Sequence, residues 1–320
     1  MTRIGFHASH EQIGPAELLR NVQQAETAGF TAVMCSDHLE PWSHRQRHAG
    51  HAWSWLGAAL ATTTLPFGVV TVPGYRHNVT VLAQAAATLA EMFPGRFWFA
   101  PGSGEYLNEH VTGEDWPTKE DRQQRLGECL TVLRRLHEGE RVTHHGAVTV
   151  DRARVWEQPE QRPAMFLPAL TPETAQRFAP QVDGLITVNQ PLANLRRMID
   201  SYRASGGTGR LALQVHLSWA ETEDEALAIA HEQWRTNVFS SRTMAGMALP
   251  EDYDRKAERE PVSPGQLRGA VNISADPGRH AAWLQEYVEL GFEEIHLHHV
   301  GRCQQRFIEE FGEKVLPQFG

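Results

Sequence analysis

Residues 3–29 read RIGFHASHEQIGPAELLRNVQQAETAG, and this stretch decides the class of fold. Arg3–Ala8 predicts a β-strand, and Pro15–Gly29 predicts an amphipathic helix that ends at a glycine. No G-x-G-x-x-G sequence follows the strand, although a doubly wound dinucleotide-binding sheet typically has one there. The stretch therefore favours the first unit of a (β/α)8 barrel, with a doubly wound sheet as the alternative.

The same alternation of strand and helix continues along the chain. Further strands are predicted at residues 31–36, 65–72, 96–100, 164–169, 184–188, 211–219 and 294–298, and helices follow most of them. Alternating units imply parallel strands, and eight of them predict a single TIM-barrel domain over residues 1–320. Two segments do not fit the repeat. Val142–Trp156 predicts a hairpin that turns at His145-Gly146, and the charged residues 240–264 suggest an insertion or a lid-like loop.

The composition excludes several classes of protein. The net charge is −9 and the pI is about 6.0, which argues against a nucleic-acid-binding surface. Only three residues are lysines and none ends a predicted strand, so Schiff-base chemistry has no support. The three cysteines form no C-x-x-C pair, which fits a reducing compartment. The chain shows no signal peptide and no apolar run of the roughly 18 residues that span a bilayer. We expect a cytoplasmic protein without a membrane partner.

Polar residues that directly follow the strands are the candidates for catalysis, because active sites of such barrels gather at the strand carboxyl ends. His38 ends the second strand beside Asp37, and an imidazole can exchange protons near neutral pH while a carboxylate orients it. The alternative interpretation is a buried aspartate that caps the loop. Trp42, four residues after His38, favours the interpretation that the pair is catalytic.

The fourth strand runs into Gly102-Ser103-Gly104-Glu105. The glycines would let a ring system approach the backbone, and they place Glu105 over the barrel mouth. Burial could raise the pKa of this carboxyl group enough for it to donate a proton. An ordinary strand-to-helix turn explains the segment equally well. Asn108, about one helical turn further, could hold a cofactor or cap the helix.

Thr171-Pro172-Glu173-Thr174 predicts a helix start, with Thr171 as the N-cap and proline at the first helical position. Free N–H groups at such a start can bind phosphate, although an ordinary cap is the simpler interpretation. The many histidines raise the question of a metal site. The first strand has a single His7 instead of an H-x-H pair, and alternation sends His296 and His298 to one face. Histidines satisfied inside the barrel are therefore favoured over a metal centre.

Three segments, Ser36–Trp42, Tyr75–Asn78 and Gly102–Glu109, resemble the luciferase-like flavin-dependent oxidoreductases. They are most similar to the branch typified by deazaflavin-dependent glucose-6-phosphate dehydrogenase. The resemblance covers most of the chain and implies a TIM barrel that transfers hydride between the cofactor and a small organic substrate. It implies a dimer as well.

The resemblance also assigns roles to residues. His38 and Glu105 would be catalytic, handling protons, and Trp42 would wall the substrate pocket. The residues placed at the cofactor are Asp37, Val69, Val70, Ser103 and Asn108. Asp37 would contact the reactive edge of the ring, Asn108 would hold the cofactor tail, and Val69-Val70 would form a bulge, often with a non-prolyl cis peptide, behind the ring.

Three departures bear on the substrate and the cofactor. The Ala-Gly-Gly that cradles phosphate in this branch is Ala169-Leu170-Thr171 here, and its substrate lysines fall near Asn189–Pro191 and Arg268-Gly269. Without those cations, glucose 6-phosphate is not expected as the substrate. Thr171 and Thr174 instead resemble the phosphate grip of FMN-binding members. The prediction is therefore FMN, with a coenzyme F420-type deazaflavin as the alternative.

FMN would permit monooxygenase chemistry, with a separate flavin reductase as electron donor. The rival functions are a metal-dependent barrel hydrolase that uses the histidines and a non-catalytic flavin-binding paralogue.

Overall fold

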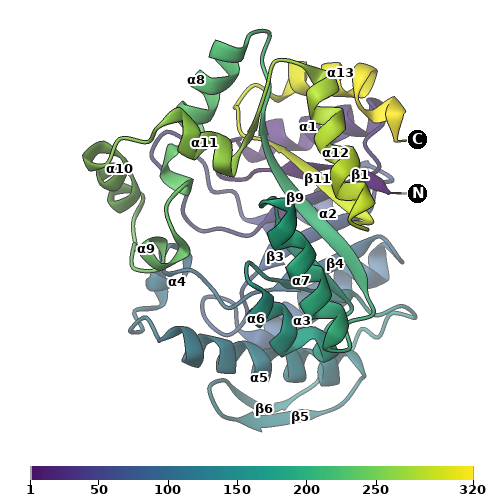
Figure 1. Cartoon of the computed structure of the whole chain (residues 1–320). Coiled ribbons are helices and arrows are strands. Elements are labelled where there is room, and N and C mark those ends of the chain that lie inside the picture. The colour runs from purple at the N-terminus through teal and green to yellow at the C-terminus, as the bar shows by residue number, and fades with distance from the viewer. Residues whose placement is uncertain (1, 320) are drawn as a thin grey trace.

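The computed structural model describes residues 2–319, apart from the side chains of residues 241 and 242. Eight parallel strands close into a barrel in the order β1-β2-β3-β4-β7-β8-β9-β11, with β11 paired back to β1 (Figure 1). These are β1 Arg3–Ala8, β2 Ala32–Ser36, β3 Phe67–Thr71, β4 Phe97–Pro101, β7 Ala164–Pro168, β8 Gly184–Val188, β9 Arg210–Ser218 and β11 Glu294–His299. The predicted (β/α)8 barrel is confirmed.

Helices cover the outside of this barrel (Figure 1). The main ones are α1 Pro15–Thr27, α2 Ala52–Thr62, α3 Val79–Met92, α5 Lys119–His137, α6 Pro172–Phe178, α7 Leu192–Ala204, α8 Glu223–Trp234, α11 Pro264–Ala270, α12 Pro277–Glu289 and α13 Gln304–Lys314. Several begin at a proline after a capping residue, because proline lacks the N–H that the first helical turn would leave unpaired. Within residues 2–319, no helix has the length and apolar character to cross a bilayer.

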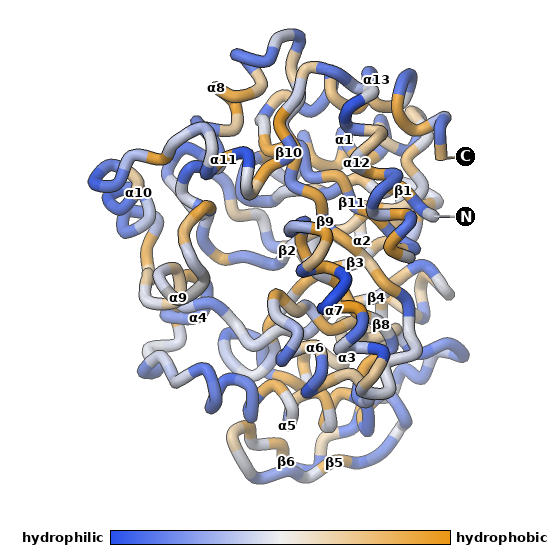
Figure 2. The backbone as a smooth tube through the Cα atoms, viewed as in Figure 1, coloured by the Kyte–Doolittle hydropathy of each residue, from blue (hydrophilic) through white to orange (hydrophobic). Residues whose placement is uncertain are grey.

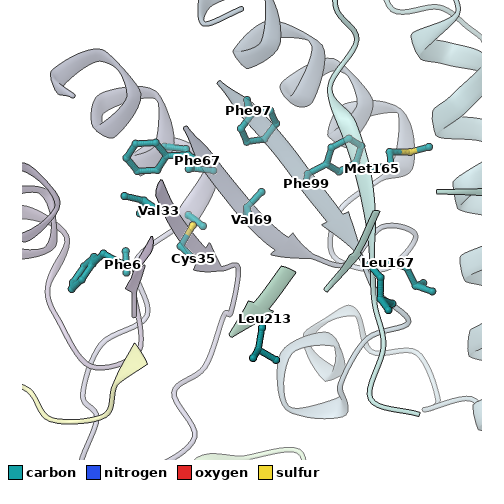
Figure 3. Packing of buried hydrophobic residues seen from close by; sticks show 14 of the residues in the cluster. Phe6, Val33, Cys35, Phe67, Val69, Phe97, Phe99, Met165, Leu167 and Leu213 are labelled. Carbon is teal, nitrogen blue, oxygen red and sulfur yellow. The ribbon is translucent and has the colours of Figure 1, made fainter. Parts of the chain in front are cut away.

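Strand alternation divides the apolar core into two layers. One face of each strand points to the helices, as Phe6, Val33, Val69 and Phe99 do (Figure 3). The other face fills the barrel interior with Met34, Trp98, Ala100, Phe166, Ile186 and Ala212. Each fully buried large side chain contributes about 2 kcal/mol to folding. The strands are accordingly apolar in Figure 2. This packing makes the barrel a rigid frame for its mouth.

The two irregular segments turn out differently. The hairpin is confirmed as β5 Val142–His145 and β6 Thr149–Ala153, which pair antiparallel. The segment 240–264, expected as an insertion or a lid-like loop, forms two helices, α9 Ser241–Met244 and α10 Pro250–Arg259, and its role as an insertion or lid stays a prediction. The buried residues of α10 lie at helical spacing, but few of them are apolar and its remaining residues are all charged, so the sequence marks the helix only weakly. The buried residues are Pro250, Tyr253, Asp254 and Ala257. Figures 1 and 2 show this hydrophilic helix at one side of the barrel. A short β10, Asn272–Ile273, extends the sheet beside β9.

Candidate active site

Half-buried, uncharged residues form the floor of the barrel mouth. Strand alternation places them one step above the interior layer, and they are Ser36, Val70, Gly102, Pro168, Val188 and Gln214. His7 and His298 complete this level from β1 and β11. Burial lowers the pKa of His7 to about 3 and that of His298 well below its ordinary value, so both are neutral. The floor of the mouth therefore carries no formal charge.

His38 stands at the edge of this floor, paired with a carboxylate that the sequence analysis did not single out. Its Nδ1 lies 2.6 Å from Oε1 of Glu11, which comes from the loop after β1. The hydroxyl of Ser9 donates to the other carboxylate oxygen at 2.7 Å. Burial alone would lower the pKa of His38, but the charge of Glu11 and its hydrogen bond outweigh burial and raise it. Burial likewise opposes ionisation of Glu11, yet His38 holds its pKa at about 2.

Glu105 lies at the same rim as His38. Its side chain is exposed at the rim, but loss of hydration to the surrounding protein still raises the pKa of its carboxyl group, and the charge of His38 lowers it. The charge of Glu105 acts on His38 in return. The backbone of Glu105 starts the short helix α4, Tyr106–Glu109, because its carbonyl accepts from the N–H groups of Asn108 and Glu109. The structure thus brings His38 and Glu105 together at one rim, and their acid–base roles stay a prediction.

Trp42 forms one wall beside this pair. Its ring is 5.4 Å from that of His38 and 5.5 Å from that of Tyr253, both edge to face. Trp42 and Tyr253 join a buried apolar cluster with Leu107 of α4, and Met244 and Met247 pack against it. The charge of Glu105, after burial itself, contributes to raising the pKa of Tyr253. The segment predicted as a lid-like loop therefore helps to build this apolar wall.

Asp37 does not face the mouth with its side chain, contrary to the role that the resemblance implied. It alternates with Ser36 and His38 and so points away from the barrel interior. Its carboxylate is fully buried, accepts from the Thr71 hydroxyl at 2.8 Å, and lies 2.7 Å from Nε2 of His77. Burial would raise the pKa of Asp37, but His77 and Arg76 lower it strongly. Asp37 thus ties the end of β2 to the end of β3 beneath His38.

Asn108 and Ser103 lie near the ends of β2 and β4. The side-chain oxygen of Asn108 accepts from the N–H groups of Leu39 and Glu40, at 2.8 and 3.3 Å. It fixes the loop that carries Trp42, and its proposed contact with a cofactor stays a prediction. Ser103 is half-buried in the turn before Gly104, whose φ of 88° is open to glycine without strain.

Comparison with known proteins assigns the family. Residues 1–294 match the family model described as luciferase-like monooxygenase. The chain belongs to this family. An "F420-dependent glucose-6-phosphate dehydrogenase" of Microbacterium testaceum is 34% identical over 328 residues, covering 99% of this chain and 97% of the relative. A protein of the same description from Nakamurella multipartita is 33% identical over 331 residues, with coverage of 99% and 96%.

Among solved structures, an "F420-dependent secondary alcohol dehydrogenase in complex with an F420-acetone adduct" superposes with a TM-score of 0.90. It is 26% identical, and the match covers 98% of both chains. The predictions of a luciferase-like fold and of a flavin- or deazaflavin-dependent oxidoreductase are confirmed. FMN as the main cofactor finds no support in these relatives, nor do the hydrolase and the non-catalytic paralogue.

The β3 positions that this family resemblance placed behind the ring need correction. The side chain of Val69 packs between the barrel and the helices, so it does not reach the mouth, whereas Val70 faces inward. The peptide bonds of residues 2–319 are all trans, so the expected cis bond at Val69-Val70 is absent from the structure. Strand alternation is again the physical reason that only one of the two side chains can face a ligand.

Thr171 is the N-cap of α6, as predicted. Its hydroxyl accepts from the N–H of Thr174 at 3.4 Å, and Gln123 donates to the hydroxyl of Thr174 at 3.3 Å. Both hydroxyls thus serve the fold, and the phosphate grip stays a prediction.

The histidines of the loop after β2 do not converge. His44 pairs with Glu251 on α10, and His51 caps α2. Within residues 2–319 no cluster of three or more His, Cys, Asp or Glu side chains is arranged to hold a metal ion.

Sequence reasoning missed Glu11, Tyr253 and His216. Glu11 lies three residues beyond its strand, and reading only the residues next to each strand end overlooks such loop positions. Tyr253 lies on the unpredicted α10. His216 lies two residues before the end of the long strand β9, where alternation alone would have shown it facing inward.

Proposed function

We propose that this protein is a deazaflavin-dependent oxidoreductase that interconverts a small, uncharged alcohol and its carbonyl compound. The observation that carries the proposal is the buried Glu11–His38 pair at the barrel mouth, at 2.6 Å, with Glu105 at the same rim. Its relatives support the choice of cofactor, because two similar enzymes and a similar solved structure are described as F420-dependent. A homodimer remains a prediction.

The mouth fits a flat, largely apolar ring. Its floor is uncharged, and the inward residues Val70, Gly102 and Pro168 present small or compact surfaces. A Cβ on Gly102 would come within 3.3 Å of Pro168, so the glycine keeps this part of the floor low. When bound there, a deazaflavin supplies a ring carbon that accepts or donates a hydride. The floor residues would hold the ring, and the rim residues would face the substrate.

The rim supplies the proton chemistry. Since Nδ1 of His38 is held by Glu11, Nε2 is the nitrogen left for the substrate. During alcohol oxidation the carbon loses a hydride, and Nε2 takes the hydroxyl proton; during carbonyl reduction Nε2 returns that proton to the oxygen. Glu11 stabilises the imidazolium that forms. The half-buried position of His38 beside Trp42 limits competing water.

The substrate is proposed to lack a phosphate. The wall formed by Trp42, Leu107 and Tyr253 is apolar. Pro191 and Gly269 stand near the positions where the resembled branch has substrate lysines. Nearby Arg268 donates to the carbonyl of Ile273 and lies 3.5 Å from Glu223, so its charge is already partnered. An apolar wall without a free cation suits a small alcohol better than a sugar phosphate.

Direct titration tests the cofactor. The purified protein is titrated with coenzyme F420 and with FMN, following ligand fluorescence, and we expect saturable binding of the deazaflavin. Loss of its visible absorbance is then followed with 2-propanol, 2-butanol and cyclohexanol, with glucose 6-phosphate for comparison. Turnover of an alcohol but not of the sugar phosphate is expected. Tight FMN binding without deazaflavin binding would reject the proposal.

A further inference from the structure

His216 extends the mouth above the neutral floor. It lies on β9, is half-buried, and points inward with Ala212 and Gln214 by strand alternation. Its ring packs between those of Trp234 and His298, with centroids 4.7 and 5.2 Å away. The side-chain oxygen of Asn189 accepts from the backbone N–H of His216 at 2.9 Å. The position of this imidazole is therefore fixed from three sides.

A chain of hydrogen bonds fixes which ring nitrogens carry hydrogen, and it begins at a backbone carbonyl. The oxygen of Val300 can only accept, so the Gln12 amide must present Nε2 to it. The same Nε2 lies 3.2 Å from the side-chain oxygen of Gln233. The amide oxygen of Gln12 is thereby turned to His298, whose Nε2 is 2.8 Å away. Nε2 of His298 must carry the hydrogen and donate it.

A neutral imidazole carries one hydrogen, so Nδ1 of His298 is a bare acceptor. Two groups point at it: Nδ1 of His216 at 3.1 Å and the amide nitrogen of Gln214 at 3.4 Å. Nδ1 of His216 must then be the donor, which leaves its Nε2 without a hydrogen. Burial supports the neutral forms, because it lowers the pKa of His216 to about 4. Among residues 2–319 no protein group bonds to this Nε2.

We propose that Nε2 of His216 is a preset hydrogen-bond acceptor in the mouth, which selects a ligand that presents an uncharged N–H or O–H group. This inference deepens the proposed function and rests on it for the ligand. The donor belongs either to the pyrimidine edge of the bound ring or to a hydroxyl of the substrate. An anionic group at this position would meet a lone pair, so the subsite disfavours carboxylates and phosphates.

The first test reads the tautomer without any ligand. Nitrogen-15 NMR of histidine-labelled protein, with the His216 signals identified by their loss in His216→Phe, is expected to show hydrogen on Nδ1 and none on Nε2. A hydrogen on Nε2 would overturn the proposal. The variant Gln12→Met removes the start of the chain, and it is expected to yield a mixture of both tautomers at His216. An unchanged single tautomer in that variant would contradict the relay from Val300.

The second test measures binding in His216→Phe, which keeps a flat ring and removes the acceptor. If the ring of the cofactor is the donor, the Kd for coenzyme F420 rises about tenfold and the KM for the alcohol is unchanged. If the substrate is the donor, the KM for the alcohol rises about tenfold and the Kd for coenzyme F420 is unchanged. The control is His299→Phe, because His299 on the outer face of β11 stacks on Phe307. No change in either constant refutes the acceptor role. Failure of the wild-type protein to bind coenzyme F420 refutes the proposed function instead, and the tautomer result stands by itself.

Discussion

Replacing Glu11 by glutamine should remove most of the basicity of His38. The substitution keeps the shape of the side chain and its contact with Ser9 while it removes the charge 2.6 Å from Nδ1. His10 provides an internal reference, because burial lowers the pKa of this neighbouring histidine to about 4, although Glu11 partly opposes that shift. His38 lies half-buried beyond β2, but Glu11 holds its pKa above the ordinary value of 6.5.

Without the carboxylate, burial and Arg76 both act to lower the pKa of His38. We expect a fall of about two pH units, since an opposite charge at such a distance typically shifts a pKa by one to three. Two units correspond to roughly 3 kcal/mol of lost imidazolium stabilisation. In alcohol oxidation, kcat/KM should rise with pH, because His38 acts as a base only once it has lost its proton. The pH at which this rise occurs should be about two units lower in the variant.

The assay is the pH profile of kcat/KM together with NMR titration of His38 in the unliganded protein. Glu105→Gln is the matched control, because it removes a more weakly coupled carboxylate at the same rim and should lower the pKa of His38 less. An unchanged His38 titration in Glu11→Gln refutes the reasoning about the pair. A shifted titration with an unshifted rate profile would retain the pair and reject His38 as the catalytic base.

Three further predictions concern stability. Burial lowers the pKa values of four fully buried histidines to about 3 or 4, so the unfolded chain binds more protons than the folded chain below pH 6.5. The free energy of unfolding should therefore be complete above pH 6.5 and fall by about 2 kcal/mol per histidine at pH 5. Urea unfolding at pH 5 and at a pH above 6.5 would measure this loss. The four are His7, His10, His280 and His299. Asp37→Asn should cost about 3 kcal/mol in the same assay because it leaves Arg76 short of a buried partner, whereas Asp151→Asn, in an exposed ion pair, should cost under about 1 kcal/mol. Gly104→Ala should destabilise more than Gly113→Ala: both residues have positive φ, but only the first would bring a Cβ within 3.2 Å of neighbouring side chains, and equal losses would contradict this.

Much of the fold was readable from the sequence because each strand–helix unit carries its own signals. The strands Arg3–Ala8 and Gly184–Val188 match their predicted bounds, and the other six barrel strands differ from theirs by one or two residues at an end, because turn or capping residues bound each apolar run. α10 was missed because most of its surface is solvated. Tyr253 contacts Trp42 at the mouth, and the buried residues of α10 do recur at helical spacing. Too few of them are apolar, however, to stand out in a charged segment.

The site was predicted less completely, for two physical reasons. The resemblance located Asp37 and Val69 near the ring but could not tell side chain from backbone; alternation along β2 and β3 then turned both side chains away from the mouth. Glu11, in turn, acts from a loop. Its pairing with His38 depends on the path by which the loop after β1 reaches the end of β2. The sequence pattern does not specify the path of this loop.

The loop after β1 emerges as the element that sets the hydrogen-bond character of the mouth. Glu11 and Gln12 are adjacent in sequence, yet Glu11 contacts His38 in the loop after β2 and Gln12 contacts His298 on β11. The charged partner makes His38 a stronger base. Burial keeps the histidines of β11 and β9 uncharged, and the neutral amide of Gln12 sets which of their ring nitrogens carries hydrogen. Two imidazoles, His38 and His216, thereby acquire opposite properties from neighbouring residues of one loop. Exchanging these two residues, Glu11→Gln with Gln12→Glu, should therefore move the raised pKa from His38 to His298. NMR titration of both histidines would test this, and a double variant in which His38 keeps its raised pKa would show that the loop is not what sets it.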